Sequence, residues 1–310
     1  MKSNPKVDAL IANIEKVFIG KLDVIRLVLT GLLSNGHILV EDVPGVGKTT
    51  LSRALARSID CSYQRIQFTP DQLPSDILGV SVWDSRSNHF VFTPGPIFAN
   101  IILADEINRT TPRTQSALLE AMNDYQVTVD RKTYPLELPF LVIATQNPYE
   151  FEGTYPLPES QLDRFLMKIR VGYPEMAQER QVILNQRLTH PLDTLTAVLT
   201  KQDVLELQKQ VREVRVDESL VTYTLELVEM SRHSDKLEVG ISPRGAVALY
   251  KASQAYAFLQ GRDFVAPDDI KHLAVPVWGH RVIGRSGMHG GSEGNATIIE
   301  EFLSRVPVPV

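Results

Sequence analysis

The sequence predicts an α/β fold in which helices sandwich a parallel sheet and a smaller all-helical domain follows. Three short apolar runs support the sheet, at residues 38–40, 101–104 and 141–144. Runs that are apolar throughout are typical of parallel strands covered on both faces. From about residue 195 the pattern is helix upon helix, without further strand signals. We therefore expect an α/β core over residues 1–190 and an all-helical domain over residues 191–310.

The composition narrows the class of protein. Hydrophobic residues make up 43% of the 310, enough for a real core. A single cysteine, Cys61, excludes an intramolecular disulfide and fits a reducing compartment, so we expect a cytoplasmic protein. The sequence shows no secretory signal pattern and no apolar stretch of about 18 residues, which argues against membrane insertion. The formal charge of −5 and the lack of a basic run argue against nucleic acid as a partner.

Several other segments have recognisable patterns. Residues 8–34 repeat apolar side chains at three- and four-residue steps, as helices do, with an interruption at Gly20. Residues 68–98 and 127–139 break the alternation of strands and helices and are predicted to be hairpin-like insertions. The segment 284–294, GRSGMHGGSEG, is predicted to be a flexible loop rather than a ligand site.

A phosphate-binding loop is predicted at residues 43–50. The sequence EDVPGVGKTT follows the strand at 38–40 and opens a helix pattern over 48–58, the context such a loop requires. Glycines there let backbone N–H groups close on phosphate oxygens at the positive end of a helix. The residues expected to contact ATP are Pro44, Gly45, Val46, Gly47, Lys48, Thr49 and Thr50.

Lys48 and Thr49 have the most specific roles in this loop. Lys48 is expected to reach the β and γ phosphates, and the Thr49 hydroxyl to bind Mg²⁺. The usual motif begins with glycine, whereas this chain has Asp42. A carboxylate near a triphosphate is unfavourable, so we expect Asp42 to face away. The alternative is a plain Gly/Pro turn with an incidental Lys-Thr pair.

Polar residues also follow the other two strands. Asp105 is expected to hold Mg²⁺, and Glu106 to orient and deprotonate the attacking water. Asn147, in ATQNP, is expected to position the same water with its amide. The alternatives are an ordinary loop start or helix cap for the acidic pair, and an Asx turn before Pro148 for Asn147. Carboxyl ends of parallel strands share one edge, so these groups should converge.

These motifs and their links resemble the AAA+ superfamily and, within it, the MoxR-type ATPases. The resemblance covers residues 17–281 and is carried by the strings ILVEDVPGVGKTTL, QFTPDQLPSDILG, FTPGPIF, DEINRTTPRTQSALLEAM, ATQNPYEFEGTYPLPESQLDRF and ISPRG. It implies a P-loop core with a helical lid, binding of ATP and Mg²⁺, and a homo-oligomeric, hexameric ring. It further implies chaperone-like remodelling of a protein client, often with a von Willebrand factor A protein as partner.

The resemblance also implies roles for four further residues. Arg164 in LDRF resembles the arginine finger that reaches the neighbouring subunit's nucleotide, the alternative being a surface salt bridge with Asp163 or another carboxylate. Arg244 in SPRG resembles sensor 2, in its own site or the neighbour's, the alternative being contact with solvent only. Phe18 and Ile19 lie where such proteins hold adenine, and both are equally good core residues. The two insertions resemble the helix-2 insert and the hairpin before sensor 1.

The leading hypothesis is therefore an oligomeric ATPase that turns hydrolysis into movement of its lid and hairpins. A metal-chelatase-type motor subunit is an alternative in the same superfamily. A nucleotide-dependent binding switch with slow turnover is an alternative from another class. A nucleic-acid motor is disfavoured, because the sequence shows no nucleic-acid-binding module. A small-molecule kinase would not require groups arranged for water attack and sensing between subunits.

Overall fold

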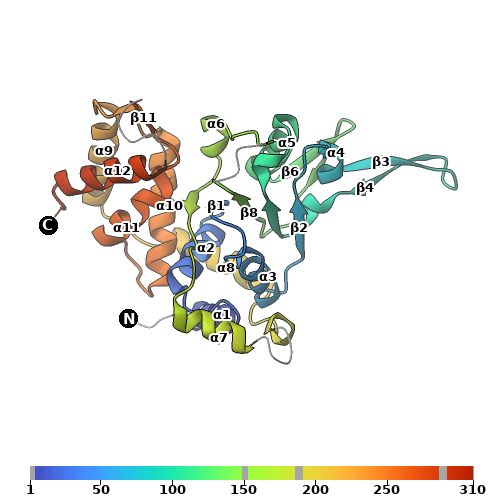
Figure 1. The fold of residues 1–310 in the computed structure, drawn as a ribbon, viewed down its shortest axis with the longest axis horizontal. Coiled ribbons are helices and arrows are strands. Elements are labelled where there is room, and N and C mark those ends of the chain that lie inside the picture. The colour runs from blue at the N-terminus through green and yellow to red at the C-terminus, as the bar shows by residue number, and fades with distance from the viewer. Residues whose placement is uncertain (1–3, 149–152, 186–190, 286–291, 310) are drawn as a thin grey trace.

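The computed structural model describes residues 4–148, 153–185, 191–285 and 292–309. Its centre is a five-stranded sheet whose neighbouring strands all pair in parallel, in the order β2-β5-β8-β1-β9 (Figure 1). The strands are β1 (Ile38–Glu41), β2 (Tyr63–Gln67), β5 (Ile101–Asp105), β8 (Leu141–Gln146) and β9 (Met167–Ile169). The predicted parallel sheet is confirmed.

Helices cover both faces of this sheet. On one face pack α1 (Pro5–Glu15), α2 (Leu22–Leu33) and α3 (Lys48–Ser58), and on the other α5 (Pro112–Asp124). Side chains alternate along each strand between the two layers, so that Ile38 and Val40 join the first and Leu39 the second. Burial on both faces explains why the strands are apolar throughout. The predicted helical pair with a break near Gly20 is also confirmed.

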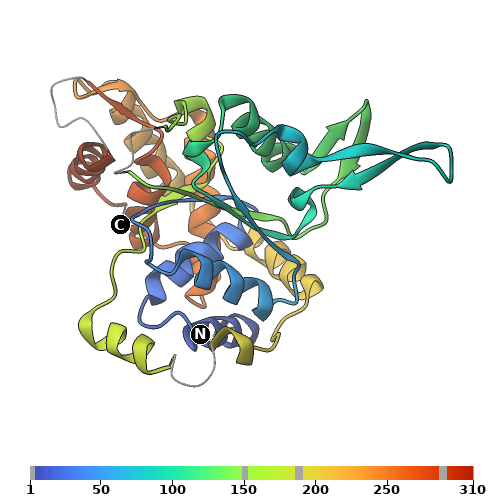
Figure 2. The ribbon, with the colours of Figure 1, turned by 45° about the vertical axis from the view of Figure 1, so that its right-hand side comes forward.

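Both predicted insertions contain antiparallel hairpins. The first consists of α4 (Pro74–Leu78), β3 (Gly79–Asp84), β4 (His89–Pro94) and the 3-10 turn η1 (Pro96–Phe98). The second pairs β6 (Gln126–Val129) with β7 (Lys132–Pro135). The rings of Phe92 and Tyr134 stack at 4.1 Å and join the two hairpins. Figure 2 shows the β3–β4 hairpin extending well beyond the rest of the molecule.

The chain between the sheet and the lid adds short elements. These are η2 (Ile107–Arg109), α6 (Glu159–Leu162), α7 (Met176–Asn185) and η3 (Pro191–Thr194). The lid itself contains α8 (Lys201–Arg212), α9 (Glu218–Arg232), α10 (Pro243–Leu259), α11 (Pro267–Trp278) and α12 (Ser292–Arg305). No helix within the described ranges is long and apolar enough to cross a membrane.

The expectation that no strand follows residue 195 is wrong in one detail. β10 (Leu237–Val239) pairs antiparallel with β11 (Ile283–Gly284) at the edge of the lid. Strands of three and two residues are too short to produce a recognisable period. The predicted loop at 284–294 is also wrong at its two ends, because Gly284 belongs to β11 and residues 292–294 belong to α12. Residues 286–291 of that predicted loop lie outside the described residues.

The lid packs directly on the core. α10 and α8 both contact α2, and one continuous hydrophobic cluster includes residues of all three helices. Asp23 of α2 also pairs with His272 of α11 at 3.2 Å. The division into domains at residues 190 and 191 stays a prediction.

Candidate nucleotide site

Three adjacent strands bring the predicted nucleotide-binding groups to one edge of the sheet. β5, β8 and β1 lie side by side in parallel and end at Asp105, Gln146 and Glu41. Asp105 and Glu106, Asn147 and the phosphate loop therefore follow neighbouring strand ends, as predicted. Such an edge, beyond the carboxyl ends of parallel strands, is the usual place for a ligand in an open α/β sheet.

The loop between β1 and α3, residues 42–47, has a backbone conformation that can bind an anion. We call this loop the cradle. Gly45 and Gly47 adopt φ values of +87° and +94°, which side chains with a Cβ rarely tolerate. No atom lies within 4 Å of where a Cβ on Gly45 would stand, whereas one on Gly47 would meet the Phe18 ring at 3.1 Å. The loop is therefore open on the Gly45 side and supported by an aromatic ring beneath Gly47.

Lys48 begins α3 and lies across this loop. Its Nζ donates to the backbone oxygens of Asp42, at 3.1 Å, and Val43, at 3.2 Å. Thr49 and Thr50 follow it in the first turn and are half-buried. A flexible ammonium group at the positive end of a helix can exchange two carbonyl oxygens for phosphate oxygens.

Asp42 faces away from the cradle, as predicted. Its Oδ2 accepts hydrogen bonds from the backbone N–H groups of Val171 and Gly172, both at 2.7 Å. Its Oδ1 accepts one from Val43 at 2.9 Å. The carboxylate that replaces the usual glycine therefore binds the chain beyond β9 and leaves the phosphate side of the loop clear.

Asp105 is held by two neighbours. Its Oδ1 accepts a hydrogen bond from the hydroxyl of Thr145 on β8 at 2.6 Å. Its Oδ2 accepts from Arg65 on β2, from Nη2 at 2.6 Å and from Nε at 3.1 Å. Only 13% of the Asp105 side chain is exposed. The guanidinium thus neutralises the carboxylate that is predicted to bind Mg²⁺.

Glu106 takes a left-handed backbone conformation, with φ of +58°. Such a conformation is uncommon outside glycine and is concentrated at functional sites. The hydroxyl oxygen of Thr145 accepts the Glu106 N–H at 2.9 Å. The carboxylate oxygen Oε2 accepts from Gln67 Nε2 at 2.8 Å and from Arg109 Nη1 at 3.0 Å. Glu106 is therefore oriented from three sides.

The groups at this edge fit ATP and Mg²⁺. The glycine cradle has the open space and positive φ values that a phosphate requires. A threonine hydroxyl and a carboxylate are hard oxygen donors, which Mg²⁺ prefers. Among the described residues no group of three or more His, Cys, Asp or Glu side chains could hold a metal. Mg²⁺ is commonly bound by one or two protein groups together with substrate phosphates.

The remaining candidates around the cradle differ in burial. Asn147 directly follows β8 and is half-buried. Phe18 is only 6% exposed, belongs to the core cluster and supports Gly47, which favours its structural role. Ile19 is half-buried next to it. Adenine binding by either residue stays a prediction.

Arg164 lies where the parallel strands begin, at the opposite end of the sheet from the cradle. It precedes β9, and its Nη1 donates to the backbone oxygen of Leu119 at 3.1 Å. The adjoining Leu166 N–H bonds to the backbone oxygen of His37, just before β1 begins. β1 has four residues, which span roughly 13 Å, so Arg164 cannot serve the cradle of its own chain.

Arg244, near the start of α10, lies on the same side as Arg164. Both line one cavity of 190 Å³ together with Lys251 and Arg281. Arg244 Nη2 donates to Asn123 Oδ1 at 2.8 Å, so the alternative of contact with solvent only is wrong. The structure thus brings Arg164 and Arg244 together and keeps both away from the cradle of the same chain.

Asp163, the residue before Arg164, contacts two arginines of the lid. Its carboxylate bonds to Nε of the buried Arg281 at 2.9 Å and lies 3.8 Å from Arg244 Nη1. Burial lowers the pKa of Arg281 to about 10 despite the carboxylate beside it. Among the described residues, Asp163 thus forms ion pairs with Arg281 and Arg244, and none with Arg164. The alternative of an Asp163–Arg164 bridge is therefore not favoured.

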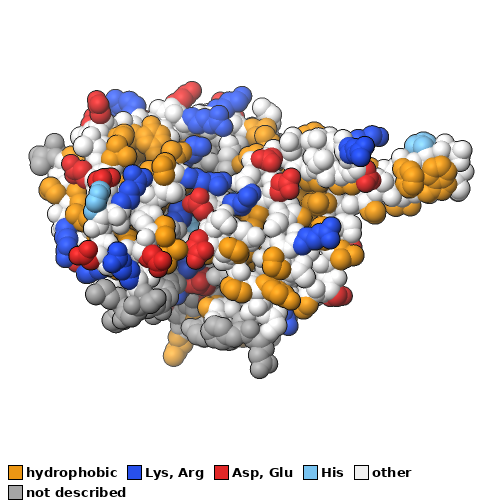
Figure 3. Space-filling model, turned by 90° about the horizontal axis from the view of Figure 1, so that it is seen from above, with side chains coloured by type: hydrophobic (Ala, Val, Ile, Leu, Met, Phe, Trp, Pro, Cys, Tyr) orange, Lys and Arg blue, Asp and Glu red, His pale blue; other side chains and the backbone are white. Residues whose placement is uncertain are grey.

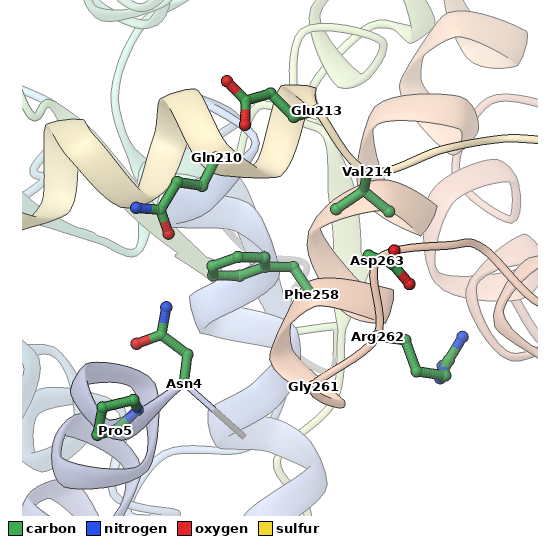
Figure 4. Close-up of a pocket in the computed structure, with 9 residues that line it drawn as sticks. All are labelled: Asn4, Pro5, Gln210, Glu213, Val214, Phe258, Gly261, Arg262 and Asp263. Carbon is green, nitrogen blue, oxygen red and sulfur yellow. The ribbon is translucent and has the colours of Figure 1, made fainter. Parts of the chain in front are cut away.

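A cavity of 690 Å³ lies elsewhere, between α1, α8 and the end of α10. Figure 4 shows the Phe258 ring projecting between Gln210 and Asn4. Its arginine, Arg262, is already paired with Asp269 at 2.5 Å. The cavity has neither a glycine cradle nor a free cation, so it does not compete as the nucleotide site.

Sequence patterns missed the residues that orient the acidic pair. Arg65 and Gln67 lie on β2 and Thr145 on β8, and each contacts Asp105 or Glu106 only after the strands pair. The one available signal was Thr145, a polar side chain near the carboxyl end of the otherwise apolar β8. β2 is largely polar and gives no such signal. Arg109 follows Glu106 by three residues in a short 3-10 turn, which the sequence pattern does not reveal.

The cradle, the acidic pair and the helical lid together define a nucleotide-binding protein of the AAA class. Residues 37–167 match the family described as "ATPase family associated with various cellular activities (AAA)", and residues 229–302 match the AAA lid domain. The chain is 51% identical to YeaC of Bacillus subtilis (strain 168), over 99% of this chain and 96% of that protein.

Chaperone MoxR1 of Mycobacterium tuberculosis is 39% identical over 96% of this chain and 81% of its own. A crystal structure of a proposed ATPase from Cytophaga hutchinsonii superposes with a TM-score of 0.89, at 40% identity over 98% of this chain and 95% of that one. The magnesium-chelatase subunit ChlI-1 of Arabidopsis thaliana matches at 32% identity over only 59% of this chain and 43% of its own. The chain therefore belongs to the MoxR-type AAA+ ATPases.

Proposed function

We propose that this protein hydrolyses ATP with Mg²⁺ as a ring-shaped, hexameric homo-oligomer in the cytoplasm and uses the energy to remodel a protein client. One observation carries the proposal. The cradle with the acidic pair lies at one edge of the sheet, and Arg164 with Arg244 at the other. A complete site then needs two copies of the chain, one supplying each edge.

Each group has a definite task in this scheme. The cradle and Lys48 bind the phosphates, while Thr49 and Asp105 hold the metal ion. Bound Mg²⁺ neutralises charge on the terminal phosphates. Glu106 accepts a proton from the attacking water, which the Asn147 amide orients. Arg65, which donates to Asp105 Oδ2, would compete with a metal ion held by this carboxylate.

Arg164 and Arg244 both act on the neighbouring subunit's nucleotide. Their shared cavity leaves room for phosphate beside the two guanidinium groups, and the length of the sheet keeps them from their own cradle. We therefore propose that Arg244 acts in the neighbour's site and not in its own. An arginine supplied in trans contributes roughly 10³ to 10⁵ in rate, so assembly controls turnover.

Steady-state ATPase assays with nucleotide-binding measurements test this proposal. Lys48→Ala should lose ATP binding, because the phosphates lose their closest cation. Glu106→Gln should keep ATP bound while hydrolysis collapses, because the amide cannot take a proton. Tight ATP binding by Lys48→Ala, or near-normal turnover by Glu106→Gln, would contradict the assignment of the site.

The β3–β4 hairpin is the element we propose for contact with the client. Trp83 and Phe90 form one exposed face, with rings 5.1 Å apart, and Val82 and Val91 the other. The side chains of Trp83 and Phe90 are 51% and 65% exposed. Figure 3 shows apolar side chains over much of the far end of this hairpin. A two-stranded hairpin with apolar side chains exposed on both faces can bind the apolar side chains of an unfolded or extended polypeptide.

A double variant, Trp83→Ser with Phe90→Ser, tests this role. It should retain basal ATPase activity and lose stimulation by an unfolded test protein such as reduced, carboxymethylated lactalbumin. His89→Ser changes an exposed residue of the same hairpin and serves as the control. Equal stimulation of the double variant and the control would remove the hairpin from client binding. A von Willebrand factor A protein as partner stays a prediction from the family resemblance.

A nucleotide-dependent switch with slow turnover is the second candidate. It is favoured by the contacts that hold the site before nucleotide binds, since Arg65 neutralises Asp105 and Lys48 bonds to its own loop. Single-turnover and steady-state rates separate the two: the ATPase turns over continuously, while the switch hydrolyses once and stays bound. The metal-chelatase alternative has only the partial similarity to chelatase subunits in its support.

A further inference from the structure

A second cavity adjoins the one that contains Arg164 and Arg244. It measures 740 Å³ and lies between the end of α2, the end of α8 and the middle of α10. The two cavities share five lining residues, which are Ser34, Asn35, Tyr125, Val247 and Lys251. They therefore form one continuous groove, which we call the arginine groove.

The arginine groove carries a large excess of positive charge. Four arginines and Lys251 line it, whereas Asp163 is the one acidic side chain among the lining residues. Asp163 is already engaged with Arg281. In the part of the chain that the structure describes, no ion pair satisfies Lys251. Cations gathered without acidic partners repel one another, so the groove favours an anion from outside the chain.

Lys251 has the position to contact the same anion as Arg244. Both residues are on α10, seven positions apart, which places them on one face about 10 Å apart along the axis. Lys251 is also the one cation that lines both cavities. Its side chain is long and exposed, so its ammonium group can turn towards a ligand in either part of the groove.

We propose that Lys251 is a third cation, beside Arg164 and Arg244, that contacts the triphosphate of a nucleotide held by a neighbouring copy of this chain. The inference rests on the proposed function in trans and deepens it. Lys251 binds the phosphates as a point charge and thereby holds the neighbour's nucleotide against the two guanidinium groups. Its charge supports the transition state less than the finger does, since a flexible ammonium group lacks the planar, bidentate geometry of a guanidinium.

The test compares Lys251→Met with Lys209→Met, which removes an exposed lysine of α8 outside the groove. We expect Lys251→Met to lower the ATPase rate per subunit roughly tenfold, a smaller loss than the roughly 10³-fold effect of an arginine finger. Lys251→Arg should restore most of the rate, because the charge returns. ATP binding to the cradle of the unassembled subunit, which has no neighbour to supply Lys251, should be unchanged in all three variants.

Mixing experiments establish whether Lys251 acts in trans. Lys251→Met subunits keep an intact cradle, and Lys48→Ala subunits keep an intact Lys251, so mixed rings should recover activity. No recovery, with mixed assembly confirmed by native mass spectrometry, would overturn the role in trans.

The result for Arg164→Ala separates this inference from the proposed function. If Arg164→Ala is inactive while Lys251→Met matches Lys209→Met, the inference about Lys251 is wrong and the proposed function stands. If Arg164→Ala retains full activity in assembled rings, the proposed function in trans is itself wrong. The thermal unfolding temperature of each variant should equal that of the unmodified protein, which checks that the substitution has not changed the fold.

Discussion

The Oδ2 oxygen of Asp42 lies 2.7 Å from the backbone nitrogen of Val171 and accepts its hydrogen bond. The same oxygen accepts from Gly172, and Oδ1 accepts from Val43. Where the usual phosphate loop has glycine, this chain has a carboxylate that fixes the loop to the segment leaving β9. We infer that the residue stabilises the position of the loop and does not take part in binding phosphate.

Replacement of Asp42 tests this stabilising role. Asp42→Ala leaves the N–H groups of Val171 and Gly172 without their charged acceptor, and hydrogen bonds to charged groups contribute about 1.5 to 3 kcal/mol each. We expect the free energy of unfolding to fall by about 3 kcal/mol, as measured by urea denaturation. Asp42→Asn keeps one acceptor oxygen and should lose less. Unchanged stability of Asp42→Ala would remove the role.

Arg65 is expected to compete with Mg²⁺ for Asp105. Its guanidinium bonds to Asp105 Oδ2, a predicted metal ligand, and the Arg65 side chain is 49% exposed. An exposed ion pair contributes at most about 1 kcal/mol, so Arg65→Met should lower the half-saturating Mg²⁺ concentration by about two- to fivefold. The measurement is ATPase activity against Mg²⁺ at constant ATP.

Arg86→Met is a suitable control for Arg65→Met, because it removes the same charge from the turn of the β3–β4 hairpin. Its Mg²⁺ requirement should equal that of the unmodified protein. If Arg65→Met instead raised the requirement for Mg²⁺, Arg65 would be supporting the metal site rather than competing for it.

His37 should make the fold sensitive to acid. Its Nε2 donates to the backbone oxygen of Met122, and its Nδ1 accepts from the Val142 N–H, so the neutral ring has both nitrogens occupied. Burial lowers the pKa of His37 to about 4. The unfolded chain, with an ordinary histidine pKa near 6.5, therefore takes up the proton first. Stability is fully present above pH 6.5 and falls as the pH drops towards 4.

The expected loss from His37 is on the order of 3 kcal/mol, from about 2.5 pKa units at 1.36 kcal/mol each. Thermal unfolding temperatures from pH 7 to pH 4 should fall less steeply in His37→Gln, whose amide can both donate and accept. The buried His280, whose pKa is also lowered by burial, keeps some acid sensitivity in that variant. His233→Gln, at an exposed position, should leave the profile as it is. Parallel profiles for the two variants would contradict the role of His37.

Local sequence patterns predicted the sheet and the cradle because their causes are local. Ile38, Leu103 and Ile143 belong to runs that are apolar throughout, and burial on both faces of a parallel sheet demands such runs. Gly45 and Gly47 adopt φ values of +87° and +94°, where a residue with a Cβ is strained. Both kinds of signal are contained in fewer than ten consecutive residues.

The contacts across strands were beyond the reach of those patterns. Gln67 and Glu106 are 39 residues apart and meet only because β2 pairs with β5. Arg164 precedes β9 and Arg244 lies near the start of α10, so their common cavity depends on how α10 packs on the core. The β10–β11 sheet escaped prediction because strands of three and two residues have no measurable period.

The central claim is that one copy of the chain completes the site of the next. It is tested most directly by the ATPase rate of rings mixed from Arg164→Ala and Lys48→Ala subunits, each inactive alone. We expect activity to return on mixing, because an intact cradle then meets an intact Arg164. Absence of any recovery, with mixed rings confirmed by native mass spectrometry, would contradict it.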